Sequence, residues 1–194
     1  MKLPLFPLNT VLFPGCTLDL QIFEARYLDM ISRCMRQHSG FGVVCLVEGH
    51  EVGPAASRFS AIGCEAHVRD FEQRANGLLG IRVEGGRRFR VEQASVLPDQ
   101  LALAEVTWLD ELPDRALLAE HADLAALLAA LAQHPSVAEL GMPGLAHSQH
   151  SLANQLAYLL PLEPAHKLEL LAEADPGLRL EQLQARLSQL QGEA

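Results

Sequence analysis

Polar and apolar residues alternate along the first 22 residues in the way that is typical of β-strands. Two short apolar runs separated by prolines come first, and then Leu18, Leu20 and Ile22 alternate with polar residues. Such alternation predicts strands with one buried and one solvated face. The spacing then changes to three and four residues, which puts apolar side chains on one side of a helix. These positions are Phe23, Tyr27, Met30, Ile31 and Cys34. We expect a helix over 24–37 that ends near Gly40.

Further strands are predicted at 41–47, 59–71, 78–83, 88–97 and 101–109. Residues 49–57 are predicted to form a loop with Gly53-Pro54 as its turn. Asn76-Gly77 and Gly85-Gly86 are typical of tight hairpin turns because both residue types tolerate positive φ, and Gly63 marks the expected bulge site in the long strand. Consecutive antiparallel strands with one early helix indicate a small closed or half-closed β-barrel, which also removes exposed sheet edges.

The pattern becomes helical from Pro113 onward. Leucines set among alanines predict a long helix, with Asp110 or Asp114 placed to cap it, and Pro135 and the segment 141–144 interrupt it. Helices over 152–160, 164–174 and 177–190 follow, the last two with prolines in their first turns. The expected fold class is therefore α+β. A β pseudo-barrel with an inserted helix occupies residues 1–112, and a helical bundle occupies residues 113–194.

Composition and charge favour a folded globule with an acidic second half. The chain is 49% hydrophobic and 20% charged, which is ample for a core. Its net charge of -9 is uneven: residues 1–92 carry 11 basic and 10 acidic residues, whereas residues 93–194 carry 4 and 14. Such a balance repels nucleic acid, although a local basic patch in the first half could still attract it.

The cysteines and the amino terminus indicate a cytoplasmic protein. Cys16, Cys34, Cys45 and Cys64 form no CxxC pair, and a chain with this much core needs no disulfides, so we expect buried, reduced thiols. Prolines break the apolar stretch that an export signal would need, and no segment approaches a transmembrane span. His147 and His150 lack a third ligand nearby, so no metal is expected there.

The opening stretch LPLFPLNTVLFPG, followed by LDLQIFEARYLDM, resembles the start of the amino-terminal, substrate-binding domain of the Lon ATP-dependent protease family. This module also occurs alone in small bacterial proteins. The similarity continues through residues 51–53, 62–66 and 79–89 and into LAYLLPLEPAHKLELLAEADPGLRLEQLQARL, so it covers nearly the whole chain. It implies a PUA-like pseudo-barrel, a fold shared with RNA-modification modules.

The chain lacks the motifs of both Lon activities. Its two lysines are Lys2 and Lys167, and neither follows a glycine, so there is no P-loop. Lys167 also has no neighbouring serine motif of the kind that a Ser-Lys protease site needs. The motifs GxSxG and HExxH are absent as well. We expect a non-catalytic protein without a cofactor. A hydrolase site assembled from distant residues stays a weaker alternative.

The resemblance implies a module that binds unfolded polypeptide or a partner protein, with a link to proteolysis or quality control. Apolar burial in a groove between barrel and helices would supply the affinity, together with strand addition at an open barrel edge. The candidate contacts are Phe13, Arg26, Phe59 and Phe71. For Arg26 an alternative is an ion pair with an acidic residue, and Phe23 and Tyr27 would then be core residues.

The alternative function is RNA binding. Four arginines cluster around the predicted Gly85-Gly86 turn, and an RNA-facing patch would consist of Arg82, Arg87, Arg88 and Arg90. The competing interpretation is a solvated hairpin whose arginines pair with Glu84 and Glu92. Given the acidic second half, nucleic acid is the less favoured partner. The client and the oligomeric state stay open.

Overall fold

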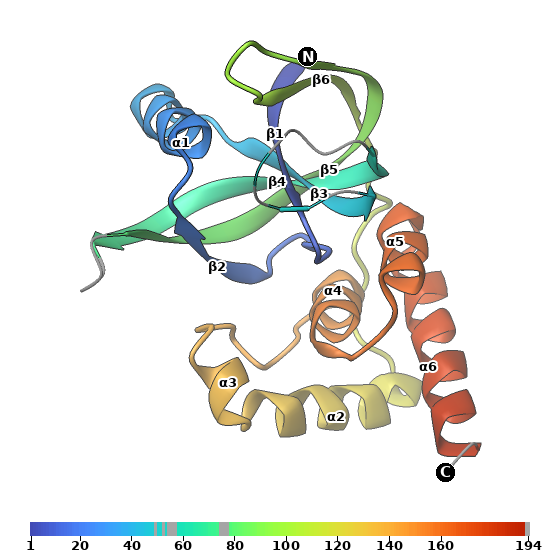
Figure 1. The fold of residues 1–194 in the computed structure, drawn as a ribbon. Coiled ribbons are helices and arrows are strands. Elements are labelled where there is room, and N and C mark those ends of the chain that lie inside the picture. Colours follow the sequence, from blue (N-terminus) through green and yellow to red (C-terminus); the bar gives the residue numbers. More distant parts are fainter. Residues whose placement is uncertain (49, 52, 54–57, 74–77, 193–194) are drawn as a thin grey trace. The chain divides into compact units, whose positions relative to one another are not determined.

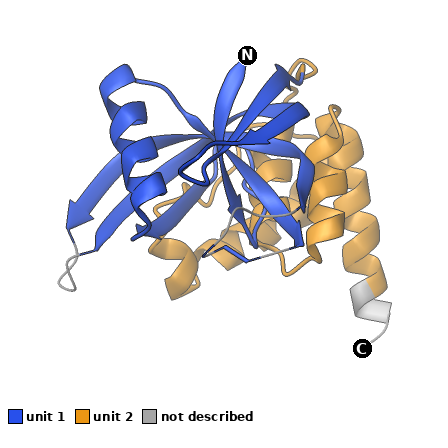
Figure 2. Cartoon of the chain, turned by 45° about the horizontal axis from the view of Figure 1, so that its top comes forward, with its two compact units in different colours: residues 1–109 blue, residues 110–194 orange. Residues whose placement is uncertain are grey.

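A computed structural model describes residues 1–48, 50, 51, 53, 58–73 and 78–192. The predicted turn at Asn76-Gly77 and most of the predicted loop around Gly53-Pro54 lie outside the described residues. The chain forms two compact units, Met1–Leu109 and Asp110–Ala194, which Figure 2 shows in different colours.

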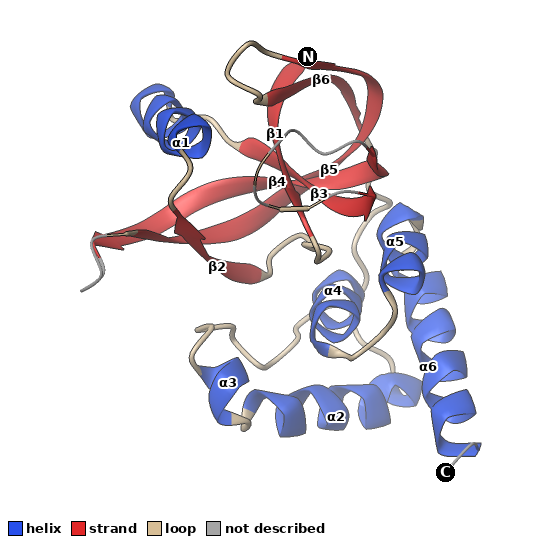
Figure 3. Cartoon of the chain, in the orientation of Figure 1, coloured by secondary structure: helices blue, strands red, loops and turns tan. Residues whose placement is uncertain are grey.

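The first unit is a six-stranded sheet that partly closes into a ring. Its strands are β1 (Lys2–Leu8), β2 (Thr17–Ile22), β3 (Phe41–Glu48), β4 (Arg58–Gln73), β5 (Leu79–Val96) and β6 (Ala102–Trp108). The order is β2-β5-β4-β3-β1-β6, and a further pairing of β5 with β6 closes the ring (Figures 1 and 3). Among the strand pairings of the described residues, β1 with β3 is parallel and the others are antiparallel. The predicted α+β class with a β pseudo-barrel is confirmed.

Helix α1 (Ala25–Gln37) follows β2 directly, as the change of spacing predicted. Its buried side carries Tyr27, Met30, Ile31 and Cys34. The helix ends at His38, whose left-handed conformation lets its N–H reach carbonyls of the last turn. The prediction for Phe23 was wrong: it precedes the helix and is 51% exposed.

The predicted hairpin at Gly85-Gly86 was also wrong, because β5 runs without a break from Leu79 to Val96. Gly85 serves a close backbone approach instead. Its N–H donates to the Cys16 carbonyl (2.9 Å), and its carbonyl accepts from the Gly15 N–H (2.8 Å). A Cβ atom at Gly85 would lie 2.1 Å from the Phe13 carbonyl oxygen, so only glycine fits here.

The core of the first unit is built around Phe89, which is fully buried. It packs with residues of β1, β3 and β6, and the Trp108 ring meets it edge-on at a centroid distance of 6.2 Å. A Cβ atom at Gly63 would lie 2.5 Å from Phe89 Cζ, so this glycine leaves room for the ring. The irregularity predicted near Gly63 is observed in the β4–β5 register between Cys64 and Ala66.

All four cysteines are buried free thiols, as predicted. Burial raises the pKa of Cys34 and Cys45 and raises the pKa of Cys64 well above its ordinary value. The thiolate forms are therefore disfavoured, and these thiols are poor nucleophiles.

The second unit is helical. It consists of η1 (Ala119–His121), α2 (Ala122–Ala132), α3 (Pro135–Ala138), α4 (Gln149–Leu159), α5 (Pro164–Ala172) and α6 (Pro176–Gly192). The prolines in the first turns of α5 and α6 stand where the sequence predicted them. Within the described residues no helix is both long enough and apolar enough to cross a membrane.

The helix predicted to start at Pro113 begins only at Ala119, so that prediction was wrong. Leu118 is still extended, and its N–H donates to His121 Nδ1 (3.2 Å). Asp114 does not cap this helix, because its Oδ1 accepts from the His150 N–H (3.1 Å) at the start of α4. Ser148 caps α4 by accepting a hydrogen bond from the Ser151 N–H.

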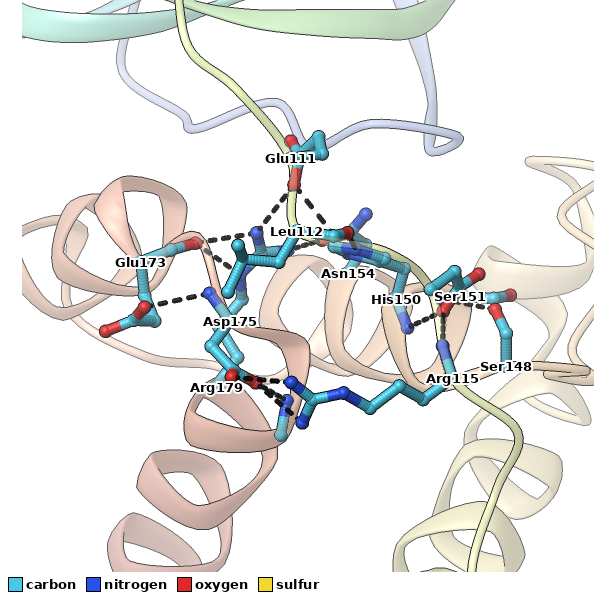
Figure 4. A network of polar contacts seen from close by, with 12 residues as sticks. Glu111, Leu112, Arg115, Ser148, His150, Ser151, Asn154, Glu173, Asp175 and Arg179 are labelled. Carbon is cyan, nitrogen blue, oxygen red and sulfur yellow. Dashed lines mark hydrogen bonds and ion pairs between the residues drawn. The ribbon is translucent and has the colours of Figure 1, made fainter.

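A buried arginine holds the helices of the second unit together (Figure 4). Arg179 on α6 is fully buried, and its guanidinium donates to Asn154 Oδ1 on α4. It also donates to the Glu173 carbonyl (2.7 and 2.9 Å) after α5 and lies 3.3 Å from Glu111 Oε2. The fork of donors thus joins three helices and the segment that precedes η1.

Candidate functional site

The four predicted polypeptide contacts do not share one exposed surface. Phe13 is fully buried and Arg26 is 6% exposed. Phe59 is half-buried and packs against the cluster around Phe89. Phe71, at 58% exposure, offers a large apolar surface to a partner. In this structure Phe71 is the candidate best placed to bind a client.

Arg26 is held inside the first unit by several contacts. Its guanidinium donates to the Gln100 carbonyl (2.8 Å) and to the Gly53 carbonyl (2.7 Å). It also lies 3.0 Å from Glu24 Oε2 and 4.7 Å from the centre of the Tyr27 ring. These contacts agree with the ion-pair interpretation and leave little of the guanidinium for a ligand.

The four arginines of the RNA alternative have different surroundings. Arg82 forms a two-pronged ion pair with Asp19 (2.7 and 2.8 Å). That hydrogen bonding raises the pKa of the Arg82 guanidinium. Arg87 stacks on Trp108 at 3.8 Å and contacts Glu65 Oε2 at 3.3 Å. Arg88 is fully buried, and Arg90 is exposed. These four side chains therefore do not make a common basic surface.

Phe71 lies on a part of the sheet that we call the arm. The arm consists of β2, residues 67–73 of β4 and residues 79–84 of β5, three strands that extend away from the ring in Figure 1. Cross-strand ion pairs cover part of it, such as Arg69 Nε with Glu84 Oε2 at 2.7 Å. The arm is therefore a narrow sheet that combines charged pairs with an exposed phenyl ring.

Two open hollows meet at Phe71. The first, about 350 Å³, lies between the end of α1 and β4 and is lined by Met35, His38, His67 and Phe71 among others. The second, about 200 Å³, lies on the arm and is lined by Phe71, Asp19, Ile81 and neighbouring residues. Phe71 thus belongs to both hollows.

A third hollow, about 240 Å³, runs along β2 and shares Asp19 with the second. Phe71 and Asp19 each line two of these hollows, so the three hollows are neighbours on the arm. We call the three hollows together the arm groove. Shallow apolar surface interrupted by paired charges is suited to extended chains rather than to compact small molecules.

The sequence missed two exposed apolar residues of the arm groove. Met35 is 37% exposed and lines the first hollow, and Phe23 is 51% exposed and lines the third. A signal for Met35 existed, because Leu28 and Met35 are seven residues apart on the otherwise polar side of α1. Phe23 continued the apolar spacing and gave no such signal.

Lys167 and His150, the other residues considered for catalysis or metal binding, make hydrogen-bond contacts with backbone carbonyls. Lys167 Nζ donates to the Tyr158 carbonyl (2.6 Å), and a ring nitrogen of His150 lies 2.9 Å from the Leu112 carbonyl oxygen. Within the part of the chain that the structure describes, no group of three or more His, Cys, Asp or Glu side chains is arranged to hold a metal ion.

The fold and the arm groove define a small binding domain, and comparison with known proteins supplies the family. The model of the substrate-binding domain of ATP-dependent protease La (LON) matches residues 2–189. The chain therefore belongs to the LON substrate-binding domain family.

Solved structures agree with this assignment. The crystal structure of a Lon N-terminal domain protein from Xanthomonas campestris is 38% identical, with a TM-score of 0.77, and the match covers 95% of this chain and 98% of that one. The N-terminal domain of the Mycobacterium avium complex Lon protease is 20% identical, with a TM-score of 0.63 over 94% and 96% of the two chains. This second likeness supports the fold alone.

A curated relative is much longer than this chain. The Lon protease of Brevibacillus choshinensis is 26% identical over 197 residues, a match that covers 93% of this chain and 24% of the relative. The chain thus spans about a quarter of that protease. The matching family is a substrate-binding domain, so a binding role is the part of Lon function that these residues represent.

Proposed function

We propose that this protein binds apolar segments of unfolded polypeptides at the arm groove. The observation that carries this proposal is the exposure of Phe71 and Met35 on opposite sides of one hollow. A client side chain placed between them would bury apolar surface on both sides, at about 25 cal/mol per Å². Large exposed apolar side chains that flank a hollow are typical of interaction sites.

We further propose that the bound polypeptides are substrates of proteolysis. This part of the proposal rests on membership in the LON substrate-binding domain family and on the similarity to a Lon protease. The role of these residues is to hold the substrate, and the peptide-cleaving chemistry belongs to a Lon-type protease domain.

Binding of single-stranded RNA is the disfavoured alternative. Arg82 and Arg87 have carboxylate partners, and Arg88 is fully buried. Of these four arginines, Arg90 is the exposed one without a carboxylate contact described above, so the four predicted residues do not form a concentrated patch for RNA.

The test is fluorescence anisotropy of the protein with a labelled polypeptide that is kept unfolded by reduction and alkylation. We expect binding that persists at high salt, because apolar burial is not screened. Phe71→Ala and Met35→Ala should each weaken binding by roughly fivefold or more, the range of a contact that contributes about 1 kcal/mol or more.

The matched control is Val96→Ala, because Val96 is 53% exposed and does not line the arm groove. It should leave the affinity unchanged. Labelled single-stranded RNA is measured in parallel at both salt concentrations. Salt-sensitive RNA binding without any polypeptide binding would overturn the proposal. Equal effects of the three substitutions on affinity would show that Phe71 and Met35 do not form the binding site.

A further inference from the structure

The third hollow of the arm groove follows the edge of β2 rather than one of its faces. It is lined by six consecutive residues, 19–24. Successive side chains of a strand point to opposite faces of the sheet, so a hollow that touches all of them must run along the backbone edge. Among the described pairings, β2 pairs only with β5. Its other edge therefore presents backbone N–H and C=O groups to this hollow.

The opposite wall is also a strand that has no partner on that side among the described residues. Phe6 and Leu8 at the end of β1 line the same hollow. The register of β1 with β6 stops at Leu5, so the residues after it pair with β3 on one side only among the described pairings. Tyr27 lies between the two walls and contacts the Phe6 ring at a centroid distance of 4.1 Å. The hollow is thus a gap in the sheet with an apolar wall.

Carboxylates line this gap, and none of the described residues that line it is Lys, Arg or His. The acidic residues are Asp19, Glu24 and Glu51. Asp19 pairs with Arg82, and Glu24 pairs with Arg26. Glu51 accepts a hydrogen bond from the Asn9 N–H, which leaves its negative charge uncompensated by that contact. Burial raises the pKa of Tyr27, while the Arg26 guanidinium lowers it and Glu24 and Glu51 raise it.

We propose that this gap binds an extended polypeptide segment by strand addition to β2, and that it prefers segments in which apolar residues alternate with lysine or arginine. Backbone hydrogen bonds to the β2 edge supply an affinity that is independent of side chains. The apolar wall receives one side of the added strand, and the carboxylates attract its basic residues. This inference rests on the proposed function and specifies its conformation and charge preference.

The backbone part is tested with fluorescein-labelled eight-residue peptides of alternating valine and lysine. Alternate amides of a strand point to the same edge, so one peptide carries N-methyl groups on the valine amides and another carries them on the lysine amides. Strand addition requires that one of the two lose about tenfold or more in affinity, since several hydrogen bonds are removed together. The other should stay within about threefold of the unmethylated peptide. Equal affinities of all three peptides would overturn strand addition.

The charge part is tested with a valine–glutamate peptide and with the variant Glu51→Gln. The glutamate peptide should bind roughly tenfold more weakly than the lysine peptide, because like charges are placed together. Glutamine keeps an oxygen that can accept from Asn9, so the variant removes charge with little other change. It should weaken lysine-peptide binding by about threefold. Glu105→Gln on β6 is the matched control and should have no effect.

The outcomes separate this inference from the proposed function. Binding of the unfolded polypeptide together with failure of all the short peptides would overturn strand addition at β2 and leave polypeptide binding intact. Equal binding of the lysine and glutamate peptides would overturn the charge preference. Failure of both the unfolded polypeptide and the peptides would overturn both proposals.

Discussion

The two units of this chain each bury one arginine completely, Arg88 in the sheet unit and Arg179 in the helical unit, but they differ in their aromatic residues. All seven phenylalanines and the single tryptophan precede residue 109, and Phe89 lies fully buried in the core of the sheet unit. The helical unit contains one aromatic residue, Tyr158, and its fully buried large polar side chain is Arg179. Large aromatic rings fill the interior of the closed sheet. Helices of leucine and alanine resemble one another in shape, so directional hydrogen bonds help to fix how they pack together.

The two units also differ in where their charged contacts lie. On the arm of the sheet unit, ion pairs such as Asp19 with Arg82 are partly exposed, and Phe71 is exposed on the same arm. In the helical unit a charged network is centred on the buried Arg179 (Figure 4). The comparison teaches that ion pairs of similar composition lie at the surface of the arm and inside the helical unit.

The largest expected effect is that of Phe89→Ala on the sheet unit. Removing a fully buried phenyl ring should lower the free energy of unfolding by about 3–5 kcal/mol. Urea denaturation measures the loss, and hydrogen exchange with mass spectrometry locates it in β4, β5 and β6. Phe71→Ala is the control with the same chemistry at an exposed site and should change stability by no more than about 0.5 kcal/mol. Equal loss of protection in α4 and α6 would show that the two units unfold as one.

A smaller effect is expected from Arg179→Met in the helical unit. Methionine fills much of the space but leaves Asn154 Oδ1 and the Glu173 carbonyl without their donor. The net cost should be about 2–3 kcal/mol, since an unsatisfied buried polar group costs about 1–3 kcal/mol. Exchange should rise in α4 and α6 while the sheet unit keeps its protection.

The control for this change is Arg186→Met, because the Arg186 side chain is 39% exposed and lies 3.7 Å from Glu169. Surface pairs of this kind contribute at most about 1 kcal/mol. A stabilised Arg179→Met variant would show that the arginine network does not hold the helices together. The proposed role of Arg179 in the helical unit would then be wrong.

The smallest expected change in stability comes from protonation of two carboxylates, Asp114 and Asp175, at low pH. Burial opposes ionisation of Asp114, but hydrogen bonds from Ser148, His150 and Arg115 prevail, so its pKa is lowered from 3.8. The pKa of Asp175 is also lowered, because the N–H groups of Gly177 and Leu178 and the Arg115 guanidinium outweigh desolvation. A lowered folded-state pKa gives stability that is present above the unfolded pKa and is lost as pH falls through the folded pKa.

The stabilisation from these two carboxylates should therefore be constant above about pH 5 and decline below about pH 4. Thermal unfolding by circular dichroism across this range measures the decline. The double variant Asp114→Asn and Asp175→Asn should have a flatter profile at low pH. Identical profiles of the variant and the parent would show that other carboxylates govern acid unfolding.

The arm groove was only partly predictable from the sequence. Phe71 was a candidate and is exposed, but Phe13 was an equal candidate and is fully buried. The two residues have the same side chain but different neighbours, since Phe13 follows Val11 and Leu12 whereas Phe71 stands between Asp70 and Glu72, so the polar neighbours of Phe71 were a local sign of its exposure. Burial depends on which distant strand covers a ring, and that information is absent from short-range spacing.

By itself the sequence determined the class of fold, helix α1, most strands, the prolines in the first turns of α5 and α6, and the family. These follow from spacing, proline and capping rules that act within a few residues. Only the tertiary structure decided that β5 continues through Gly85, that Arg179 is buried and that β2 keeps an open edge. The need for glycine at position 85 comes from the nearby Phe13 carbonyl. The burial of Arg179 is made possible by its contacts with Asn154 and Glu111. The partners are far away in the sequence, and such contacts form only when the chain closes on itself.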